Sequence, residues 1–146
     1  MENTPYLYDT LLSVLSQHAK WLDRRHRQTL AWMMVGLISS KTVSLGAWAP
    51  FVVSRARYAQ SIVRRFRRWL DNNRIKPESL YGPLIEKALG GWMGKRVYVA
   101  LDTSMLWNTY CLLRLSVIYR GRAVPLVWQV IEHGSAAVSF ATYKDV

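Results

Sequence analysis

The hydrophobic periodicity of the chain changes at Gly90–Lys95 (GGWMGK), and this change limits the folds that the chain can adopt. Before it, apolar residues recur at helical spacing over most of the sequence. After it, three runs of Val, Ile, Leu and Tyr have the composition of strands. We therefore predict an α+β chain, with an all-helical domain at residues 1–90 and a second domain at residues 91–146 that begins with three strands.

Apolar spacing predicts several helices in the first domain. A short helix is expected at Ser44–Trp48, before Pro50, and another after Pro77. The longest helix is expected over residues 55–73, with Ser54 as its N-cap, because serine is favoured at that position. Two earlier helices should bury apolar stripes, namely Leu7, Leu11, Leu12, Leu15, Ala19 and Leu22 in one, and Leu30, Met33, Met34, Leu37 and Ile38 in the other.

The second domain should open with strands at residues 96–102, 111–119 and 122–131. The last two flank Arg120–Gly121, a pair typical of a hairpin turn. Pro125 lies inside the third strand and cannot donate a backbone hydrogen bond to a neighbouring strand. We therefore expect the third strand to lie at a sheet edge or to carry a bulge.

Positive charge is concentrated in the first part of the chain. The sequence holds 20 Lys and Arg against 9 Asp and Glu, a net charge of +11. Residues 1–95 contain 15 of the basic and 6 of the acidic residues, whereas residues 96–146 contain 5 and 3. This asymmetry suggests a polyanion-binding module beside a nearly neutral one. A solvated basic surface with no partner is the alternative interpretation.

Composition excludes several other classes of protein. The chain is 51% hydrophobic and 12% aromatic, too apolar for a disordered tail. A single cysteine, Cys111, excludes a disulfide framework and a cysteine-rich zinc site, and it fits a reducing cytosol. The first ten residues lack the pattern of a secretory signal, and the longest apolar run, LAWMMVGLI, is about half the length of a membrane span. We therefore expect a cytoplasmic protein with no membrane partner.

The segment RARYAQSIVRRFRRWLDNN predicts a basic amphipathic helix. On a helical wheel, one arc should face the core and holds Tyr58, Ile62, Phe66, Trp69 and Leu70. Arginine suits phosphate because its planar guanidinium makes bidentate contacts and stays charged. The expected contacts to double-stranded DNA are Arg55, Arg57, Arg64, Arg65, Arg67, Arg68 and Arg74.

The short helix at Ser44–Trp48, the turn near Pro50 and the basic helix have the layout of a helix-turn-helix. Two other interpretations stay open: an amphipathic helix that uses arginine for solubility, and a helix that lies on a membrane surface. The tryptophans of this domain, at 21, 32, 48 and 69, recur among Leu and Met and are expected in the core rather than as platforms for nucleobases.

Asp102 ends the apolar run RVYVALD and precedes the polar pair Thr103–Ser104. A carboxylate at the end of a buried strand either caps the next segment or belongs to a catalytic set. Metal-assisted phosphoryl transfer needs two or more carboxylates around a pair of metal ions about 4 Å apart. Asp102 is therefore the candidate catalytic residue and metal ligand of the chain.

The segments SRARYAQSIVRRFRRWLDNNRI and VYVALDTSML, with the two strands after the second, resemble the N-terminal portion of bacterial insertion-sequence transposases of the DDE class. The resemblance implies a ribonuclease-H-like catalytic domain in which the first strand is central, the second pairs antiparallel with it and the third lies at the edge. It also implies that Asp102 is the first catalytic carboxylate and that the protein is bacterial and nucleoid-associated. Complete family members use Mg²⁺ or Mn²⁺ to cleave the transposon end and to join it to target DNA.

The resemblance places the second catalytic Asp and the Glu beyond residue 146. The third strand, which ends at Glu132, would lie two strands away from Asp102, roughly 10 Å at the usual strand spacing. We therefore interpret Glu132 as a surface residue and Asp145 as a helix residue. The prediction is a truncated transposase that binds DNA without cutting it, as a homodimer or with a full-length transposase. The alternatives are a non-catalytic DNA-binding regulator of transposition and a different ribonuclease-H-like nuclease.

Overall fold

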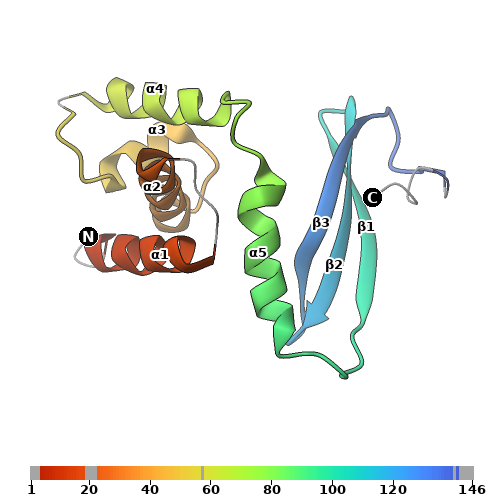
Figure 1. Ribbon diagram of the computed structural model, residues 1–146. Coiled ribbons are helices and arrows are strands. Elements are labelled where there is room, and N and C mark those ends of the chain that lie inside the picture. The colour runs from red at the N-terminus through yellow and green to blue at the C-terminus, as the bar shows by residue number, and fades with distance from the viewer. Residues whose placement is uncertain (1–3, 19–22, 57, 140, 142–146) are drawn as a thin grey trace. The chain divides into compact units, whose positions relative to one another are not determined.

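The structure, a computed structural model, describes residues 4–18, 23–56, 58–139 and 141. In these residues the chain is α+β, with five α-helices followed by a three-stranded antiparallel sheet (Figure 1). It divides into two compact units, Met1–Ala88 and Leu89–Val146. The predicted fold class is therefore confirmed, and the division lies within two residues of the boundary expected after residue 90.

Four helices and one 3₁₀ turn build the first unit before a fifth helix crosses the division. Their bounds are α1 Thr4–His18, α2 Arg24–Ser40, α3 Leu45–Trp48, η1 Ala49–Phe51, α4 Ala59–Leu70 and α5 Pro77–Gly90. Helix α2 contacts both α1 and α4 and lies between them (Figure 1). Its N-terminus is capped by Asp23, whose Oδ1 accepts a hydrogen bond from the Arg25 backbone N–H at 2.7 Å.

The basic helix is shorter than the sequence indicated. Helix α4 begins at Ala59, and the longest helix is α2, with 17 residues. Ser54 is not an N-cap, which corrects the prediction. Its Oγ instead accepts a hydrogen bond from the backbone N–H of Ala56 at 3.1 Å. A serine hydroxyl that bonds to the backbone in this way favours a local turn over a helix. Helix α4 accordingly begins at Ala59 and not directly after Ser54.

The core of the first unit forms where α2, α3, η1 and α4 meet. Its buried side chains are Met33, Trp48, Ala49, Val52, Ile62 and Phe66, with Trp32, Leu45 and Trp69 packed against them. The predicted core role is thus confirmed for three tryptophans, whereas Trp21 lies outside the described residues. The indole N–H of Trp48 donates to the Thr42 carbonyl at 2.6 Å, and that of Trp69 donates to the His26 carbonyl at 2.9 Å.

The predicted apolar stripes are only partly buried. On α2, Met33 is buried, but Leu37 and Ile38 are 41% and 51% exposed. Small residues that the spacing did not single out take their place, because α3 packs closely on α2 beside Gly36. On α4, Tyr58 and Leu70 are exposed, so only the middle of the predicted arc faces the core. The predicted positions Ala19 and Leu22 lie outside the described residues.

The second unit is an antiparallel meander in the order β1-β2-β3, with bounds β1 Val99–Leu106, β2 Tyr110–Tyr119 and β3 Arg122–Glu132. The predicted hairpin turn is confirmed, since Arg120 and Gly121 have φ angles of 50° and 74°, as a type I′ turn requires. Both expectations for Pro125 hold. Strand β3 lies at an edge of this sheet, and its register shifts where Ser116 faces Pro125.

Gly36 is required where α2 meets α3. A Cβ atom at this position would overlap the Cβ of Trp48 and lie 2.8 Å from its Cγ. We predict that Gly36→Ala lowers the free energy of unfolding by about 1–3 kcal/mol, the usual cost of overpacking a core. Urea denaturation followed by tryptophan fluorescence measures this. Gly46→Ala is the control, because its nearest neighbour, Ser44 Oγ, is 3.9 Å away; equal losses in both variants would contradict the prediction.

Gly121 is required by the hairpin between β2 and β3. Its φ angle of 74° strains any residue that carries a Cβ atom. We predict that Gly121→Ala destabilises the second unit by about 1–2 kcal/mol. Hydrogen exchange of the β2 and β3 amides measures the loss. Gly134→Ala should leave exchange unchanged, since a Cβ there meets no atom within 4 Å and no positive φ is involved; unaltered exchange in Gly121→Ala would refute this interpretation of the turn.

Candidate nucleic-acid interface

Helix α4 presents a face of three exposed arginines. Ile62 is 6% exposed and Phe66 is fully buried, and these two side chains fix the rotation of the helix about its axis. Residues at i, i+3 and i+4 lie on one side of a helix. The opposite side of α4 therefore carries Arg64, Arg67 and Arg68, which we call the outer face.

The outer face encloses a shallow hollow of roughly 430 Å³, lined by its three arginines and by Asp71. In the described part of the chain, salt bridges join only Arg25 to Asp23 and Arg114 to Asp102. The outer-face guanidinium groups thus make no salt bridge with a described carboxylate, and the single carboxylate of Asp71 leaves the lining of the hollow with an excess of positive charge. Three planar cations around one hollow suit an anion with several oxygen atoms, such as a phosphate of a nucleic-acid backbone.

The other arginines proposed from the sequence have different surroundings. Arg55 is exposed in the segment before α4, and Arg74 is exposed in the turn after it. The backbone N–H of Arg74 donates to Asn72 Oδ1 at 3.1 Å, so this turn is locally ordered. Arg57 lies outside the described residues. The structure therefore gathers three of the seven predicted contacts on one face.

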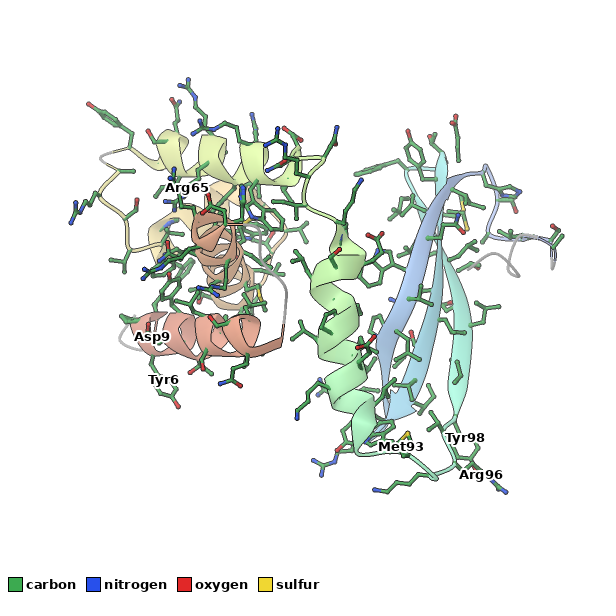
Figure 2. All side chains as sticks on the ribbon, viewed as in Figure 1. Tyr6, Asp9, Arg65, Met93, Arg96 and Tyr98 are labelled. Carbon is green, nitrogen blue, oxygen red and sulfur yellow. The ribbon has the colours of Figure 1, made fainter. Side chains whose placement is uncertain are left out.

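Arg65 differs from the neighbouring arginines because it turns towards the helical core. The sequence predicted it as a contact to DNA, but its Nε and Nη2 atoms are buried and have no hydrogen-bond acceptor among the described residues. Figure 2 shows Arg65 on the side of α4 that faces α2. Burial lowers the pKa of its guanidinium, and the nearby Tyr8 acts in the opposite direction.

The helix-turn-helix layout is looser than the sequence suggested. Helix α3 has only 4 residues, and residues 49–58, including η1, separate it from α4. A helix-turn-helix joins its two helices by a turn of about 3–4 residues. Any DNA binding by the outer face of α4 would therefore depend on its arginines and not on a helix-turn-helix motif.

Asp102 lies in the middle of β1, which corrects the prediction that it ends the strand. Strand β1 continues to Leu106, and Asp102 pairs with Arg114 of β2 in the register. The Arg114 Nη2 donates to Asp102 Oδ2 at 2.6 Å. Both side chains are partly exposed, so this salt bridge contributes about 0–1 kcal/mol to stability. It nevertheless places a cation against one of the two carboxylate oxygens of Asp102.

The described residues around Asp102 do not fit a Mg²⁺ or Mn²⁺ site. No group of three or more His, Cys, Asp and Glu side chains lies close enough together to hold a metal in the described ranges. Glu132 is exposed and pairs with Tyr110, which lies four residues along β2 from Arg114, the partner of Asp102. Glu132 is therefore offset from Asp102 by roughly 13 Å along the strands and by roughly a further 10 Å across them. Asp145 lies outside the described residues.

Two features were missed in the sequence although it carries their signals. Arg114 interrupts the apolar run CLLRLSVIY, and a charge inside such a strand indicates a cross-strand partner. The run RRHR at residues 24–27 opens α2 and brings Arg24 and Arg27 close enough to Tyr8 to lower its pKa. Tyr8 itself stacks on Trp32, with ring centroids 4.1 Å apart.

Two further findings bear on the class of protein. No single helix in the described ranges is long and apolar enough to cross a membrane; α2 and the segment Leu45–Phe51 reach that length only together, across a bend of 96°. No family model, curated protein or solved structure matches the chain.

The surroundings of Tyr8 make stability depend on pH. Burial raises the pKa of Tyr8 above its ordinary value of 10.0, Asp9 raises it further, and Arg24, Arg27 and Arg65 oppose this. The folded state thus holds the phenolic proton more tightly than the unfolded state. This contribution is complete below pH 10.0 and is lost as the pH rises through the folded pKa.

We predict that the loss of stability between about pH 9 and about pH 11 is smaller in Tyr8→Phe than in the wild type. Urea midpoints at the two pH values measure it. Tyr6→Phe, on the same helix but 72% exposed, is the control and should lose as much stability as the wild type. Identical losses in all three proteins would show that Tyr8 titrates as it does in the unfolded chain.

Proposed function

We propose that the helical unit binds double-stranded DNA through the outer face of α4, with Arg64, Arg67 and Arg68 contacting backbone phosphates. The observation that supports this is the hollow lined by three exposed guanidinium groups that have no described salt bridge. Contacts of this kind release counterions and depend little on base sequence. Exposed Arg55 and Arg74 flank α4 in the sequence and extend the positive charge along the chain.

The resemblance to DDE transposases extends this proposal to recognition of transposon ends. Its support is the Arg-rich segment followed by an antiparallel β1-β2-β3 meander whose third strand is bulged and lies at an edge. The position of Asp102 does not add to this support, because the residue is central in β1 and bonded to Arg114. We therefore derive no catalytic step from this chain.

A DNA-binding regulator of transposition is the second candidate. The Asp102–Arg114 salt bridge favours it, since a regulator needs no free carboxylate at this position. Both candidates require the same DNA-binding surface. They differ in whether Asp102 takes part in metal-dependent cleavage by an assembled transposase.

The outer face is tested by neutralising its charges. We predict that replacing Arg64, Arg67 and Arg68 together by Gln removes about one phosphate contact per arginine. Binding to a duplex should therefore weaken at least tenfold. The slope of log affinity against log salt concentration should become less negative by about 2.7, which is three times the value of about 0.9 for one contact. Fluorescence anisotropy with a labelled duplex over a range of salt concentrations measures both quantities.

The matched control removes the same charge elsewhere. Lys76, Lys87 and Lys95 are exposed and lie outside α4. Replacing all three by Gln should change affinity less than threefold, allowing for the weakened long-range field. If this control loses as much affinity and slope as the outer-face variant, binding follows net charge alone and the proposed interface is refuted.

A further inference from the structure

One end of the sheet in the second unit gathers exposed aromatic and basic side chains. It is formed by the segment that leads into β1 and by the hairpin between β2 and β3. The backbone N–H of Ile118 donates to the Tyr98 carbonyl at 2.9 Å, which joins these two parts. We call this area the end surface, and its members are Trp92, Arg96, Tyr98, Tyr119, Arg120 and Arg122. Figure 2 shows Arg96 and Tyr98 at this end of the sheet.

The aromatic side chains of the end surface have two different roles. Tyr98 is 64% exposed, so its ring is open to a ligand. The rings of Trp92 and Tyr119 pack on each other with centroids 5.0 Å apart, and they make a supported apolar base beside it. An exposed aromatic ring offers a flat face on which an unpaired nucleobase can stack, whatever the identity of the base. Tyr98 is therefore the stacking position of the end surface.

The end surface is positively charged. Arg96, Arg120 and Arg122 are exposed, and none of them forms a salt bridge in the described part of the chain. The Cζ atom of Arg120 lies 5.3 Å from the centroid of the Tyr119 ring. A guanidinium that stacks on a ring can still donate hydrogen bonds in its own plane, so Arg120 is positioned for a phosphate.

The carboxylates of the second unit lie away from the end surface. Its described acidic residues are Asp102 and Glu132. Asp102 is bonded to Arg114 in the middle of the sheet, and Glu132 pairs with Tyr110 at the opposite end. A polyanion that approaches the end surface therefore meets cations and aromatic rings of this unit, and no described carboxylate of it.

We propose that the end surface binds a single strand of nucleic acid, with Tyr98 stacking on an unpaired base and the three arginines contacting phosphates. Sites for single strands combine these two chemistries, cations along the backbone and aromatic rings for the bases. A duplex fits less well, because its bases already stack on one another. Single strands of DNA and RNA share this chemistry. The proposal concerns the second unit and does not rest on the function proposed for the outer face of α4.

The first experiment is a titration of the full chain into a labelled oligothymidylate of about ten nucleotides, followed by fluorescence anisotropy. We expect saturable binding that weakens at least fivefold in Tyr98→Ala, the effect of losing one stacked base. Tyr98→Phe keeps the ring and should bind within about twofold of the wild type. Tyr6→Ala, which removes a 72% exposed tyrosine of α1, is the control and should also stay within about twofold. Absence of saturable binding, or equal losses in Tyr98→Ala and Tyr6→Ala, would overturn the proposal.

The phosphate contacts are tested through the salt dependence. Replacing Arg96 and Arg122 together by Gln should make the slope of log affinity against log salt concentration less negative by about 1.4, twice the value of about 0.7 for one single-strand contact. Lys76 and Lys87 are exposed and outside the end surface. Replacing these two by Gln removes the same charge and should leave the slope unchanged. Equal changes of slope in the two variants would show that the strand responds to net charge alone, which overturns the site.

The outer-face variant separates this proposal from the function proposed for α4. Tyr98→Ala should leave the affinity for a duplex within about twofold of the wild type, because duplex binding does not use the stacking position. If the outer-face variant abolishes single-strand binding and Tyr98→Ala has no effect on it, the strand binds at α4 and the end surface is refuted. Loss of duplex binding in the outer-face variant leaves the end surface untouched.

A last measurement needs no variant, so it holds even if the substitutions disturb folding. A strand of abasic sites with the same length keeps the phosphates and lacks the bases, so it should bind the wild-type chain at least fivefold more weakly than oligothymidylate. Equal affinities would overturn the stacking contact. Oligodeoxyuridylate and oligouridylate differ only in the 2′-hydroxyl, so the tighter of these two identifies the strand as DNA or RNA.

Discussion

The burial of Phe66 and Ile62 is the interaction on which the proposed function of the helical unit depends. Phe66 is fully buried and contacts Trp48, with ring centroids 6.0 Å apart. Burying such a side chain is worth about 1.5–3 kcal/mol, and the two together fix the rotation of α4. Without this anchoring, the rotation of α4 about its axis would not be fixed, and its outer-face arginines would not be held on the exposed side. The polar surface is thus a consequence of the apolar packing beneath it.

The sequence was most informative where a single physical rule acted alone. The type I′ turn at Arg120–Gly121 and the bulged edge strand at Pro125 follow from backbone chemistry that no tertiary contact can reverse. The middle of the α4 arc, Ile62 and Phe66, followed from helical periodicity. Its ends did not, because α4 begins only at Ala59 and Leu70 reaches solvent.

Two other predictions failed because they needed partners that are remote in the sequence. Helical spacing predicted that Leu37 and Ile38 are buried, but the close approach of α3 at Gly36 decides which side of α2 faces the core. The sequence predicted that the strand ends at Asp102, because Thr103 and Ser104 are polar. The pairing of β1 with β2 continues beyond them to Leu106, and Arg114 gives the carboxylate a cross-strand partner. Strand length was set by this pairing and not by local hydrophobicity.

Helix α4 shows how one residue step separates two kinds of arginine. Arg64 and Arg65 are adjacent, yet a step of about 100° around the helix axis sends one to the exposed hollow and turns the other towards α2. An exposed guanidinium keeps its hydration and can pair with the phosphates of a polyanion without a large desolvation penalty. A guanidinium with a buried edge has already lost that hydration. The guanidinium of Arg65 also lies over the Phe66 ring, with its Cζ 5.7 Å from the ring centroid. Arg65 is therefore not one more contact of the outer face: it belongs to the packing that fixes the rotation of α4, and this packing leaves Arg64, Arg67 and Arg68 as the arginines of α4 that a polyanion can reach.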